Sequence, residues 1–521
     1  MLPNVVHVLM RNGDEERVVQ KDSGSGAGTG PVTVSDRRRW IALAIVMTAS
    51  FMDLVDVTIV NIAIPSIQES TGASFSAVQW VTGGYALAFA IGLITGGRLG
   101  DIHGRKRLFL IGMAGFTLAS ALCGLASGPE VLVAMRILQG GTAALMVPQV
   151  LSIVHATFPA EERGKVFGLF GAVVGLGAVS GPLIGALLTE WDVLGLGWRP
   201  IFLINLPVGI AGLVLGRIYI GESKAEKALR LDLPGVLLAS TGLLMLIYPL
   251  THGREAGWPL WGHLVMAGSL PVFALFVAYE RIKTRRDGSP LVELSLFRVK
   301  SFAAGIGVQL TFGVVSGIFF LVWTLYMQLG LGWSPLKAGT TGIPFSLAVS
   351  TAAGVSVQQL VPRFGRKVLQ AGALVMAVGV LVYIAEAHRY GTGIAPWQMA
   401  LPLVVMGAGM GLIVAPITNA VLAEVPQEHA GSASGLINTV NQVGLALGLG
   451  LVSVAFFDAV PAGATAGPAF VGAFQHAMWW VLGVLAVVFL LMFALPGKQG
   501  AQAAPAAAGE AGETERELAL V

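Results

Sequence analysis

Long apolar runs, separated by short polar connections, make up most of the chain between two polar tails. A run of about 20 apolar residues is long enough to cross a bilayer as a helix. Runs of this kind are expected at 40–64, 77–97, 108–127, 130–155, 164–189, 200–220, 234–252, 260–280, 301–329, 336–360, 367–386, 397–422, 436–457 and 474–495. The pattern therefore predicts an all-α membrane protein with fourteen spans, and disordered tails at 1–36 and 497–521.

Basic residues are concentrated in alternate connections. Clusters of Lys and Arg occur at 37–39, 98–107, 217–230, 281–300 and 363–367, whereas the opposite connections hold few bases and several acids. Short cytoplasmic connections carry an excess of Lys and Arg. We therefore expect both termini to be cytoplasmic, which requires an even number of spans.

Composition supports this prediction and excludes several other functions. Only 12% of the residues are charged, 55% are hydrophobic, and 69 glycines allow helices to approach closely in lipid. The formal net charge is only +3, so nucleic-acid binding is not expected. The single cysteine, Cys123, excludes an intrachain disulfide. The histidines are scattered and no Walker loop occurs, so we expect neither an enzyme nor a cofactor.

A weak internal repeat predicts two related halves. Phe158-Pro159 followed by Gly164 recurs as Val425-Pro426 followed by Gly431. Parallel repeats are typical of transporters in which two bundles rock around a central site. The expected domains are a six-helix bundle at 37–220, a two-helix hairpin with its linkers at 221–299, and a second six-helix bundle at 300–496.

Two carboxylates interrupt the first apolar run. Asp53 and Asp56 are three residues apart and therefore share a helix face. A carboxylate in the hydrocarbon costs a few kcal/mol, which favours a functional role. Two acids this close do not both ionise easily, so at least one is expected to bind and release a proton. A solvated cavity wall is the alternative for Asp53.

Arg136 in the fourth run needs a partner within the bilayer. Helix geometry places Asp56 roughly 13 Å and Arg136 roughly 9 Å from the outer ends of their spans, which are similar depths. We therefore hypothesise that Arg136 biases the proton equilibrium of Asp56. Backbone carbonyls are the alternative partners.

Four motifs resemble those of the major facilitator superfamily, and within it the drug:proton antiporter family with fourteen spans. They are Asp56-Val57-Thr58-Ile59-Val60-Asn61, Arg136-Ile137-Leu138-Gln139-Gly140, the loop Gly97–Arg107, and the series Gly171, Gly175, Gly177, Gly181-Pro182 and Gly185. The resemblance covers nearly the whole chain between the tails. It implies the major facilitator fold and a cell-membrane exporter that exchanges lipophilic or cationic drug-like molecules for protons, without a cofactor and as a monomer. A proton-coupled importer, or a lipid or metabolite transporter of the same fold, is one alternative. A transport-silent membrane sensor is another.

The resemblance also implies roles for several residues. A conformational latch would involve Gly97, Gly100, Asp101, Gly104, Arg105 and Arg107, although a basic turn is a simpler interpretation. Gly177, Gly181, Pro182 and Gly185 would form the antiporter-motif helix, and a packing face alone would explain the same spacing. The expected substrate-cavity residues are Asn61, Gln139, Trp323, Tyr326 and Asn441. Some multidrug members carry an acid in span 13, which this chain lacks, so a broad dicationic substrate range is not expected.

Overall fold

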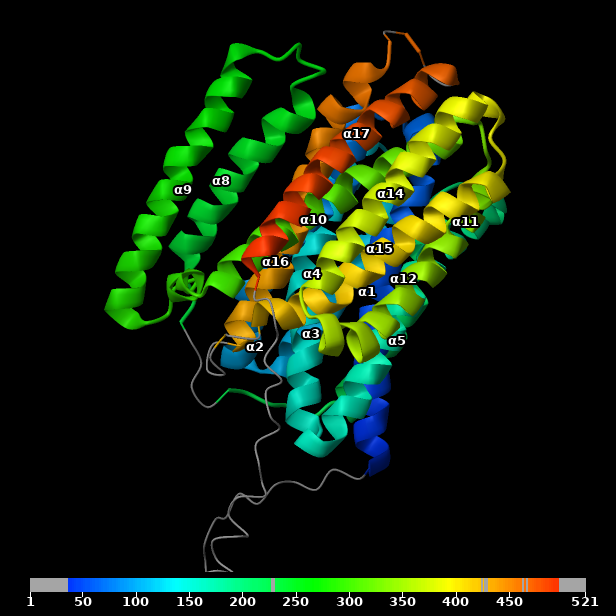
Figure 1. Cartoon of the computed structure of the whole chain (residues 1–521). Helices are drawn as coiled ribbons and strands as arrows, with labels where there is room; N and C mark the ends of the chain where they lie inside the picture. The colour runs from blue at the N-terminus through cyan, green and yellow to red at the C-terminus, as the bar shows by residue number, and fades with distance from the viewer. Residues whose placement is uncertain are drawn as a thin grey trace, which may run out of the picture.

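The computed structural model describes residues 36–225, 230–422, 425, 430–461, 463–464 and 467–495. Pro426 of the internal repeat and the two predicted tails, apart from Asp36 at the start of α1, lie outside these residues. The regular elements of the described part are helices, arranged as two bundles beside a hairpin (Figure 1). The first bundle comprises α1 (Asp36–Thr71), α2 (Phe75–His103), α3 (Arg105–Gly124), α4 (Pro129–Thr157), α5 (Ala160–Glu190), α6 (Pro200–Leu203) and α7 (Asn205–Tyr219). The hairpin consists of α8 (Leu233–His252) and α9 (Leu260–Asp287). The second bundle comprises α10 (Lys300–Leu325), α11 (Pro335–Thr340), α12 (Ile343–Val355), α13 (Val361–Phe364), α14 (Lys367–Tyr390), α15 (Pro396–Leu422), α16 (Ala430–Ala455) and α17 (Pro468–Leu491).

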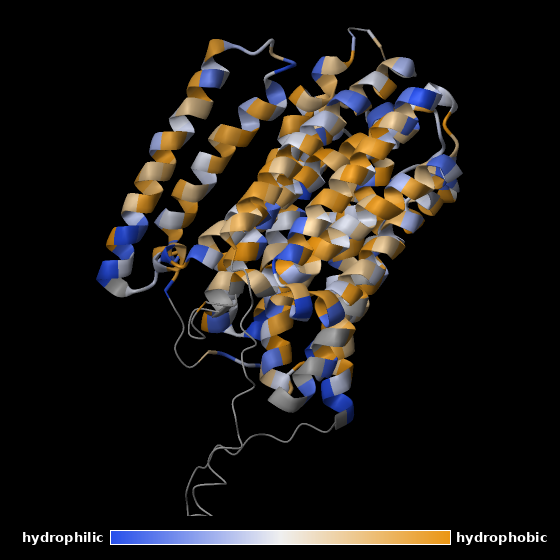
Figure 2. Cartoon of the chain, in the orientation of Figure 1, coloured by the Kyte–Doolittle hydropathy of each residue, from blue (hydrophilic) through white to orange (hydrophobic). Residues whose placement is uncertain are grey.

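Thirteen helical segments among the described residues are long and apolar enough to cross a membrane. They coincide with thirteen of the fourteen predicted spans. The remaining one, 164–189, falls within α5, a continuous helix of 31 residues. At 1.5 Å per residue, α5 is about 46 Å long and can also span the bilayer. Figure 2 shows apolar residues along the middle of the helices and polar residues near their ends.

Three predicted spans are not single regular helices. The ninth, 301–329, continues from α10 into a π-helical segment at Tyr326–Gly330. The sixth is divided at Ile204 into α6 and α7. The tenth, 336–360, is divided into α11 and α12, and a π-helical segment at Ser356–Leu360 joins α12 to α13. Apolar length predicts that a segment spans the membrane, but it carries no information on such interruptions.

Glycines bring the helices of the first bundle close together. A Cβ atom at Gly96 would overlap the backbone of Ala144, and one at Gly140 would overlap the carbonyl oxygen of Tyr85. Close backbone approach is the usual way for helices to pack in lipid, where hydrophobic burial contributes little. These contacts fix α2 against α4, and α4 carries Arg136.

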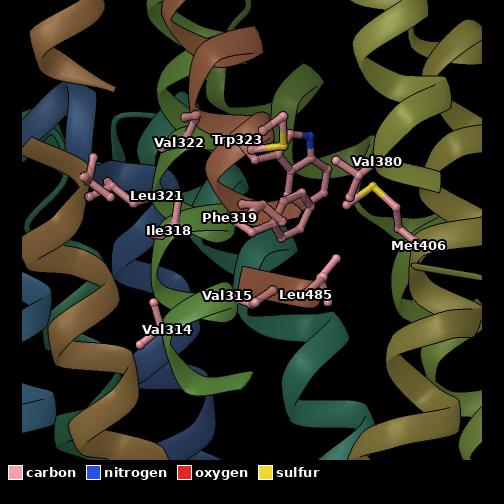
Figure 3. Packing of buried hydrophobic residues seen from close by; sticks show 14 of the residues in the cluster. Val314, Val315, Ile318, Phe319, Leu321, Val322, Trp323, Val380, Met406 and Leu485 are labelled. Atoms are coloured by element: carbon pink, nitrogen blue, oxygen red, sulfur yellow. The ribbon is translucent and has the colours of Figure 1, made fainter. Parts of the chain in front are cut away.

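The second bundle combines glycine contacts with a large apolar core. Gly313 on α10 lies against Gly444 on α16 at backbone distance. Figure 3 shows Phe319 and Trp323 of α10 packed near Val380 of α14 and other buried apolar side chains. Aromatic stacking adds to this core, since the rings of Phe319 and Trp323 have centroids 5.4 Å apart. The core continues into the first bundle through a few residues at one end of the helices.

The direct contacts between the bundles gather at the end that the charge pattern predicts to be extracellular. Gln328 donates through Nε2 to the carbonyl oxygen of Ile62 at 2.7 Å, and the rings of Phe75 and Phe457 have centroids 4.1 Å apart. The Leu336 amide donates to the Glu190 carboxylate at 3.0 Å. These contacts close the seam between the bundles at its outer end.

The hairpin lies across this closed seam and contacts both bundles. Trp80 of α2 donates through Nε1 to the Thr251 hydroxyl at 2.9 Å, and Ser453 of α16 donates to the carbonyl oxygen of Leu250 at 2.5 Å. The Ser76 hydroxyl and amide donate to Glu255 at 2.7 and 2.9 Å. Burial alone would raise the pKa of Glu255, but these hydrogen bonds outweigh it and hold the pKa below its ordinary value.

The rest of the hairpin lies at the periphery of the molecule. In the most apolar stretch of 18 residues of α9, only 11% of the residues are buried, against 72% in the corresponding stretch of α2. An apolar surface this exposed is suited to contact with lipid.

Candidate functional site

A cluster of buried polar side chains lies in the middle of the first bundle. Asp56 comes from α1, Arg136 and Gln139 from α4, and Asn205 from the start of α7. All four side chains are at most 2% exposed. Apolar residues that include Val55, Ile59 and Phe202 form a core cluster around this level. The polar groups therefore interact in a medium of low dielectric constant.

Asp56 accepts three hydrogen bonds from three different side chains. Arg136 Nη1 lies 2.5 Å from Asp56 Oδ2. Gln139 Nε2 and Asn205 Nδ2 each lie 2.8 Å from Asp56 Oδ1. An ionised carboxylate can accept from all three donors at once, and a guanidinium is the strongest of them. The geometry fits an ionised Asp56 paired with Arg136, and the contact predicted from their similar depths is present.

Arg136 is held by more than its carboxylate partner. Its Nε donates to the carbonyl oxygen of Val81 at 3.0 Å, and its Nη1 also donates to Gln139 Oε1 at 2.7 Å. The guanidinium carbon lies 4.3 Å from the centroid of the Tyr85 ring. The sequence suggested either a carboxylate or backbone carbonyls as partners for Arg136, and the structure contains both kinds of partner. Arg136 Nη2 is buried with no hydrogen-bond partner among the described residues.

Asp53 is joined to this network through Tyr85. Asp53 is 9% exposed, and its Oδ1 accepts a hydrogen bond from the Tyr85 hydroxyl. The face of the same tyrosine ring lies under Arg136. One rigid side chain thus links the two carboxyl groups. The Tyr85 hydroxyl binds Asp53, and the Tyr85 ring packs against Arg136, which is the partner of Asp56.

The glycines of α5 position the helix that carries both acids. A Cβ atom at Gly177 would stand 3.0 Å from Leu54 Cβ, one at Gly181 would overlap the Thr58 hydroxyl, and one at Gly185 would stand 2.7 Å from atoms of Ile59 and Ile62. The series is therefore a packing face against α1. The adjacent Pro182 has a half-buried side chain, and its carbonyl oxygen lies 3.0 Å from the point where a Cβ atom on Gly339 of α11 would stand. Helix α5 thus connects the acid-bearing helix to the second bundle.

The segment expected to act as a latch loop is largely helical: residues 97–103 are the last turns of α2, Gly104 is the turn, and Arg105 begins α3. It makes defined contacts at the end of the bundle that the charge pattern predicts to be cytoplasmic. Arg105 Nη2 lies 2.8 Å from Asp101 Oδ1. Gly104 has a φ of 113°, and a Cβ atom there would stand 2.6 Å from the carboxylate carbon of Glu222. Glu222 in turn accepts hydrogen bonds from the amides of Lys106 and Arg107, at 3.1 and 3.2 Å. A carboxylate at the start of α3 is favoured by the exposed amides of that helix end.

Two other glycines of this loop allow α2 to approach α4. Gly97 lies near Pro148, and a Cβ atom at Gly100 would overlap the side chain of Gln149. Arg98, which lies between them, donates to the carbonyl oxygens of Arg230 and Ser289 at 3.0 and 3.2 Å. These contacts connect the loop to the linkers at the cytoplasmic end of the hairpin.

The expected cavity residues occupy three different environments. Trp323 and Tyr326 lie in the core of the second bundle, where Trp323 donates to the Tyr383 hydroxyl at 3.0 Å. Asn61 and Asn441 are half-buried, and Asn61 Oδ1 is a buried acceptor without a donor among the described residues. The remaining candidate, Gln139, belongs to the Asp56 network.

Two residues of the network were not found from the sequence. Tyr85 follows a pair of glycines in α2, and Asn205 follows the break after α6. A polar residue beside a break in an apolar run was a signal for Asn205. The position of Tyr85 between the acids depends on how α2 packs against α1 and α4, which a single sequence does not encode visibly. Within the described residues, no three His, Cys, Asp or Glu side chains come together in a way that could hold a metal ion.

Comparison with known proteins places the chain in a family. Residues 46–449 match the family model described as Major Facilitator Superfamily. The chain is 43% identical to the "Probable actinorhodin transporter" of Streptomyces coelicolor, over 85% of this chain and 76% of that protein. It is 35% identical to the "Tetracenomycin C resistance and export protein" of Streptomyces glaucescens, over 83% of this chain and 79% of that protein.

Solved structures share the fold at low sequence identity. The structure resembles an auto-inhibited POT family peptide transporter with a TM-score of 0.64 and 15% identity, over 88% of this chain and 96% of that one. It resembles a D-xylose–proton symporter with a TM-score of 0.61 and 16% identity, over 88% and 98% of the two chains. The chain therefore belongs to the major facilitator superfamily, a family of membrane transporters rather than enzymes.

Proposed function

We propose that this protein exports lipophilic small molecules from the cytoplasm in exchange for protons. Two relatives are named for transport or export of actinorhodin and tetracenomycin C, which supports an antibiotic or drug as the substrate. The observation that carries proton coupling is the fully buried Asp56–Arg136 pair, with Asp53 joined to it through Tyr85. We further propose a monomer in the cell membrane with both termini cytoplasmic, as the distribution of basic residues favours.

The exchangeable proton is assigned to the two carboxyl groups of α1. Asp56 already accepts three donors and faces a permanent positive charge, so protonating it would leave Arg136 without its counter-charge. Among the described residues Asp53 accepts a hydrogen bond from the Tyr85 hydroxyl and forms no salt bridge, so in this conformation it is the group that can hold a proton at lower cost. Movement of Tyr85 or Arg136 would change the balance between the two acids.

The conformation described here corresponds to the cytoplasm-facing half of the cycle. The outer seam is closed by the contacts of Gln328 and Phe75, and the hairpin covers it. In this state the acid pair would release its proton as the substrate enters from the cytoplasm. After the bundles rock, the outward state would release the substrate and take up a proton. The cycle uses binding to shift a two-state equilibrium, which requires that each ligand prefers one state.

The proton gradient supplies enough free energy for this exchange. One charge that moves down a membrane potential of 100 mV releases about 2.3 kcal/mol. A further 1.4 kcal/mol, roughly, comes from each pH unit across the membrane. One proton can thus sustain a substrate gradient of more than tenfold, since tenfold corresponds to about 1.4 kcal/mol.

Dye efflux tests this function directly. Cells that express the wild-type chain should accumulate less ethidium than cells without it, and collapse of the proton gradient should abolish the difference. Asp56→Asn and Asp53→Asn should each impair efflux, whereas Glu130→Gln, which changes an exposed acid at the outer start of α4, should not. Increased accumulation would instead support an importer. Efflux that survives collapse of the gradient, or that is intact in both single variants, would refute proton coupling through this site.

A further inference from the structure

A second pair of buried acids lies at the cytoplasmic end of the hairpin. Asp232 caps the start of α8 and is 2% exposed, and Glu280 lies in the last part of α9 and is 0% exposed. Neither residue belongs to a motif of the transport site. Acids are rarely buried this completely unless they are paired, so their partners need to be identified.

The two carboxyl groups face each other across a glycine. Glu280 Oε1 and Asp232 Oδ2 lie 2.6 and 2.7 Å from the point where a Cβ atom on Gly235 would stand. Both oxygens therefore border the same small volume beside Gly235. Two carboxyl groups this close can hydrogen-bond to each other when one of them carries a proton. Glu280 Oε1 is buried and has no hydrogen-bond partner among the described residues, so a shared proton is the group that would satisfy it.

The charged and titratable neighbours of the pair come from two elements, α9 and α2. Tyr279 of α9 donates its hydroxyl to Asp232 Oδ1 at 2.9 Å. The positive charge of Arg98 on α2 attracts Glu280 electrostatically, and that of Lys283 on α9 attracts Tyr279. Arg98 is bonded to backbone carbonyls of the linkers. Arg98 supplies one positive charge for two carboxyl groups, so one of the two acids is favoured to keep its proton over ionisation of both.

The acid pair holds a strap formed by residues 289–292. The Leu291 amide donates to Asp232 Oδ2 at 3.1 Å, and the Val292 amide donates to Glu280 Oε2 at 2.9 Å. The other side of the strap faces Arg98, which donates to the carbonyl oxygens of Ser289 and Pro290. Four consecutive residues thus connect the acids of the hairpin to the cytoplasmic loop of the first bundle.

We propose that Asp232 and Glu280 form a proton-binding site that fastens the 289–292 strap and, through Arg98, ties the hairpin to the end of α2. Loss of the shared proton places two negative charges within one small buried volume. Their repulsion separates the carboxyl groups and frees the amides that they hold. A rise in cytoplasmic pH therefore loosens the attachment of the hairpin. This site is separate from the Asp56 network, and the inference does not depend on the proposed export function.

Hydrogen exchange of the full chain in lipid nanodiscs tests this site without any transport assay. The measured quantity is the protection of the Leu291 and Val292 amides between pH 5.5 and 8.5, corrected for the intrinsic pH dependence of exchange. In the wild type, protection should fall with rising pH by up to about tenfold per unit, as release of one proton requires. Glu280→Gln keeps an acceptor for the strap and donates to Asp232 as the shared proton does, so its protection should be independent of pH.

A matched control lies next to the strap. Glu293→Gln makes the same chemical change at a residue that caps the following turn through the Ser295 amide, and it should behave as the wild type does. Infrared difference spectra, recorded in the Asp53→Asn background to remove the carboxyl of the transport site, provide a second measurement: this protein should show a protonated carboxyl band that disappears at high pH, and adding Asp232→Asn should change that band. Flat protection in the wild type, unchanged pH dependence in Glu280→Gln, or absence of the band would overturn the proposal. Restoration of protection at pH 8.5 by sodium but not by choline would assign a metal cation to the site and would also overturn it.

Discussion

Replacing Arg136 by glutamine removes one of the two charges at the centre of the buried network. In the wild type, Arg136 Nη1 and Asp56 Oδ2 are 2.5 Å apart and both side chains are 0% exposed. The carboxylate in R136Q keeps Gln139 and Asn205 as donors but has lost its counter-charge. Breaking a fully buried pair from one side costs about 3–5 kcal/mol, because the remaining charge is uncompensated. The free energy of unfolding should fall by this amount at neutral pH.

Proton uptake distinguishes this cost from a simple packing defect. In folded R136Q, Asp56 can escape its isolation by binding a proton that the unfolded chain does not hold at neutral pH. Since the folded state then binds more protons, its stability should increase as the pH falls. Asp56→Asn leaves Arg136, which does not release its proton, so the same relief is not expected. The double variant contains neither charge and should be less destabilised than the sum of the singles.

The only cysteine of the chain provides the assay. Cys123 is buried, and its Sγ lies 3.7 Å from Gln139 Oε1, directly beside the network. A maleimide fluorophore therefore labels it only when this bundle opens. At pH 7.5, R136Q should be labelled about 10²- to 10³-fold faster than the wild type, because 1.4 kcal/mol corresponds to about tenfold. The ratio to the wild type should decrease at pH 5.5. Equal rates at both pH values, or additive losses in the double variant, would refute the reasoning.

Three further predictions concern other parts of the structure. Tyr85→Phe keeps the ring beside the Arg136 guanidinium but removes the hydroxyl that donates to Asp53. The pH at which dye efflux is half-maximal should therefore shift, while the rate of Cys123 labelling should change little. An unchanged pH profile would count against a coupling role for Tyr85. Gly181→Ala forces a methyl group into Thr58 and should lower the free energy of unfolding by about 1–3 kcal/mol, measured by thermal unfolding in detergent. The control Gly354→Ala, whose methyl group meets open space, should not destabilise the fold. Equal effects of the two substitutions would contradict the packing role of Gly181. Because the pKa of Glu255 is held below its ordinary value, its hydrogen bonds to the start of α2 should persist at neutral pH and be lost only when the pH falls through that lowered pKa and the carboxylate protonates. Hydrogen exchange at that helix start should therefore increase in Glu255→Ala at pH 7, and no increase would contradict this account.

Much of the architecture could be predicted because membrane helices have strong local signals. Apolar length identifies the spans, and thirteen predicted spans coincide with helical segments that are long and apolar enough to cross a membrane. The contact between Asp56 and Arg136 was also predictable, because a charge inside the bilayer requires a partner at a similar depth. These inferences use one segment, or one pair of segments, at a time.

The remaining features depend on how several helices pack together. Trp323 and Tyr326 lie in the core of the second bundle, and that placement depends on how α10 and the segment after it pack against α14 and α17. Tyr85 joins the two acids only because glycines bring α2 against α4. Glu280 lies in a basic stretch where an acid suggests only a surface charge, and its burial becomes visible once α9 packs against α8. Orientation around a helix axis is set by neighbours that are distant in the sequence.

The most direct test of proton coupling is the number of protons released when a substrate binds. Purified protein in lipid nanodiscs, weakly buffered and containing a pH indicator, is mixed with ethidium, and proton release is measured against dye bound. The wild type should release protons in proportion to bound dye, and the Asp53→Asn/Asp56→Asn double variant should bind dye without releasing them. Dye binding by the wild type with no proton release, or equal release by the double variant, would contradict the assignment of the coupling site to these two acids.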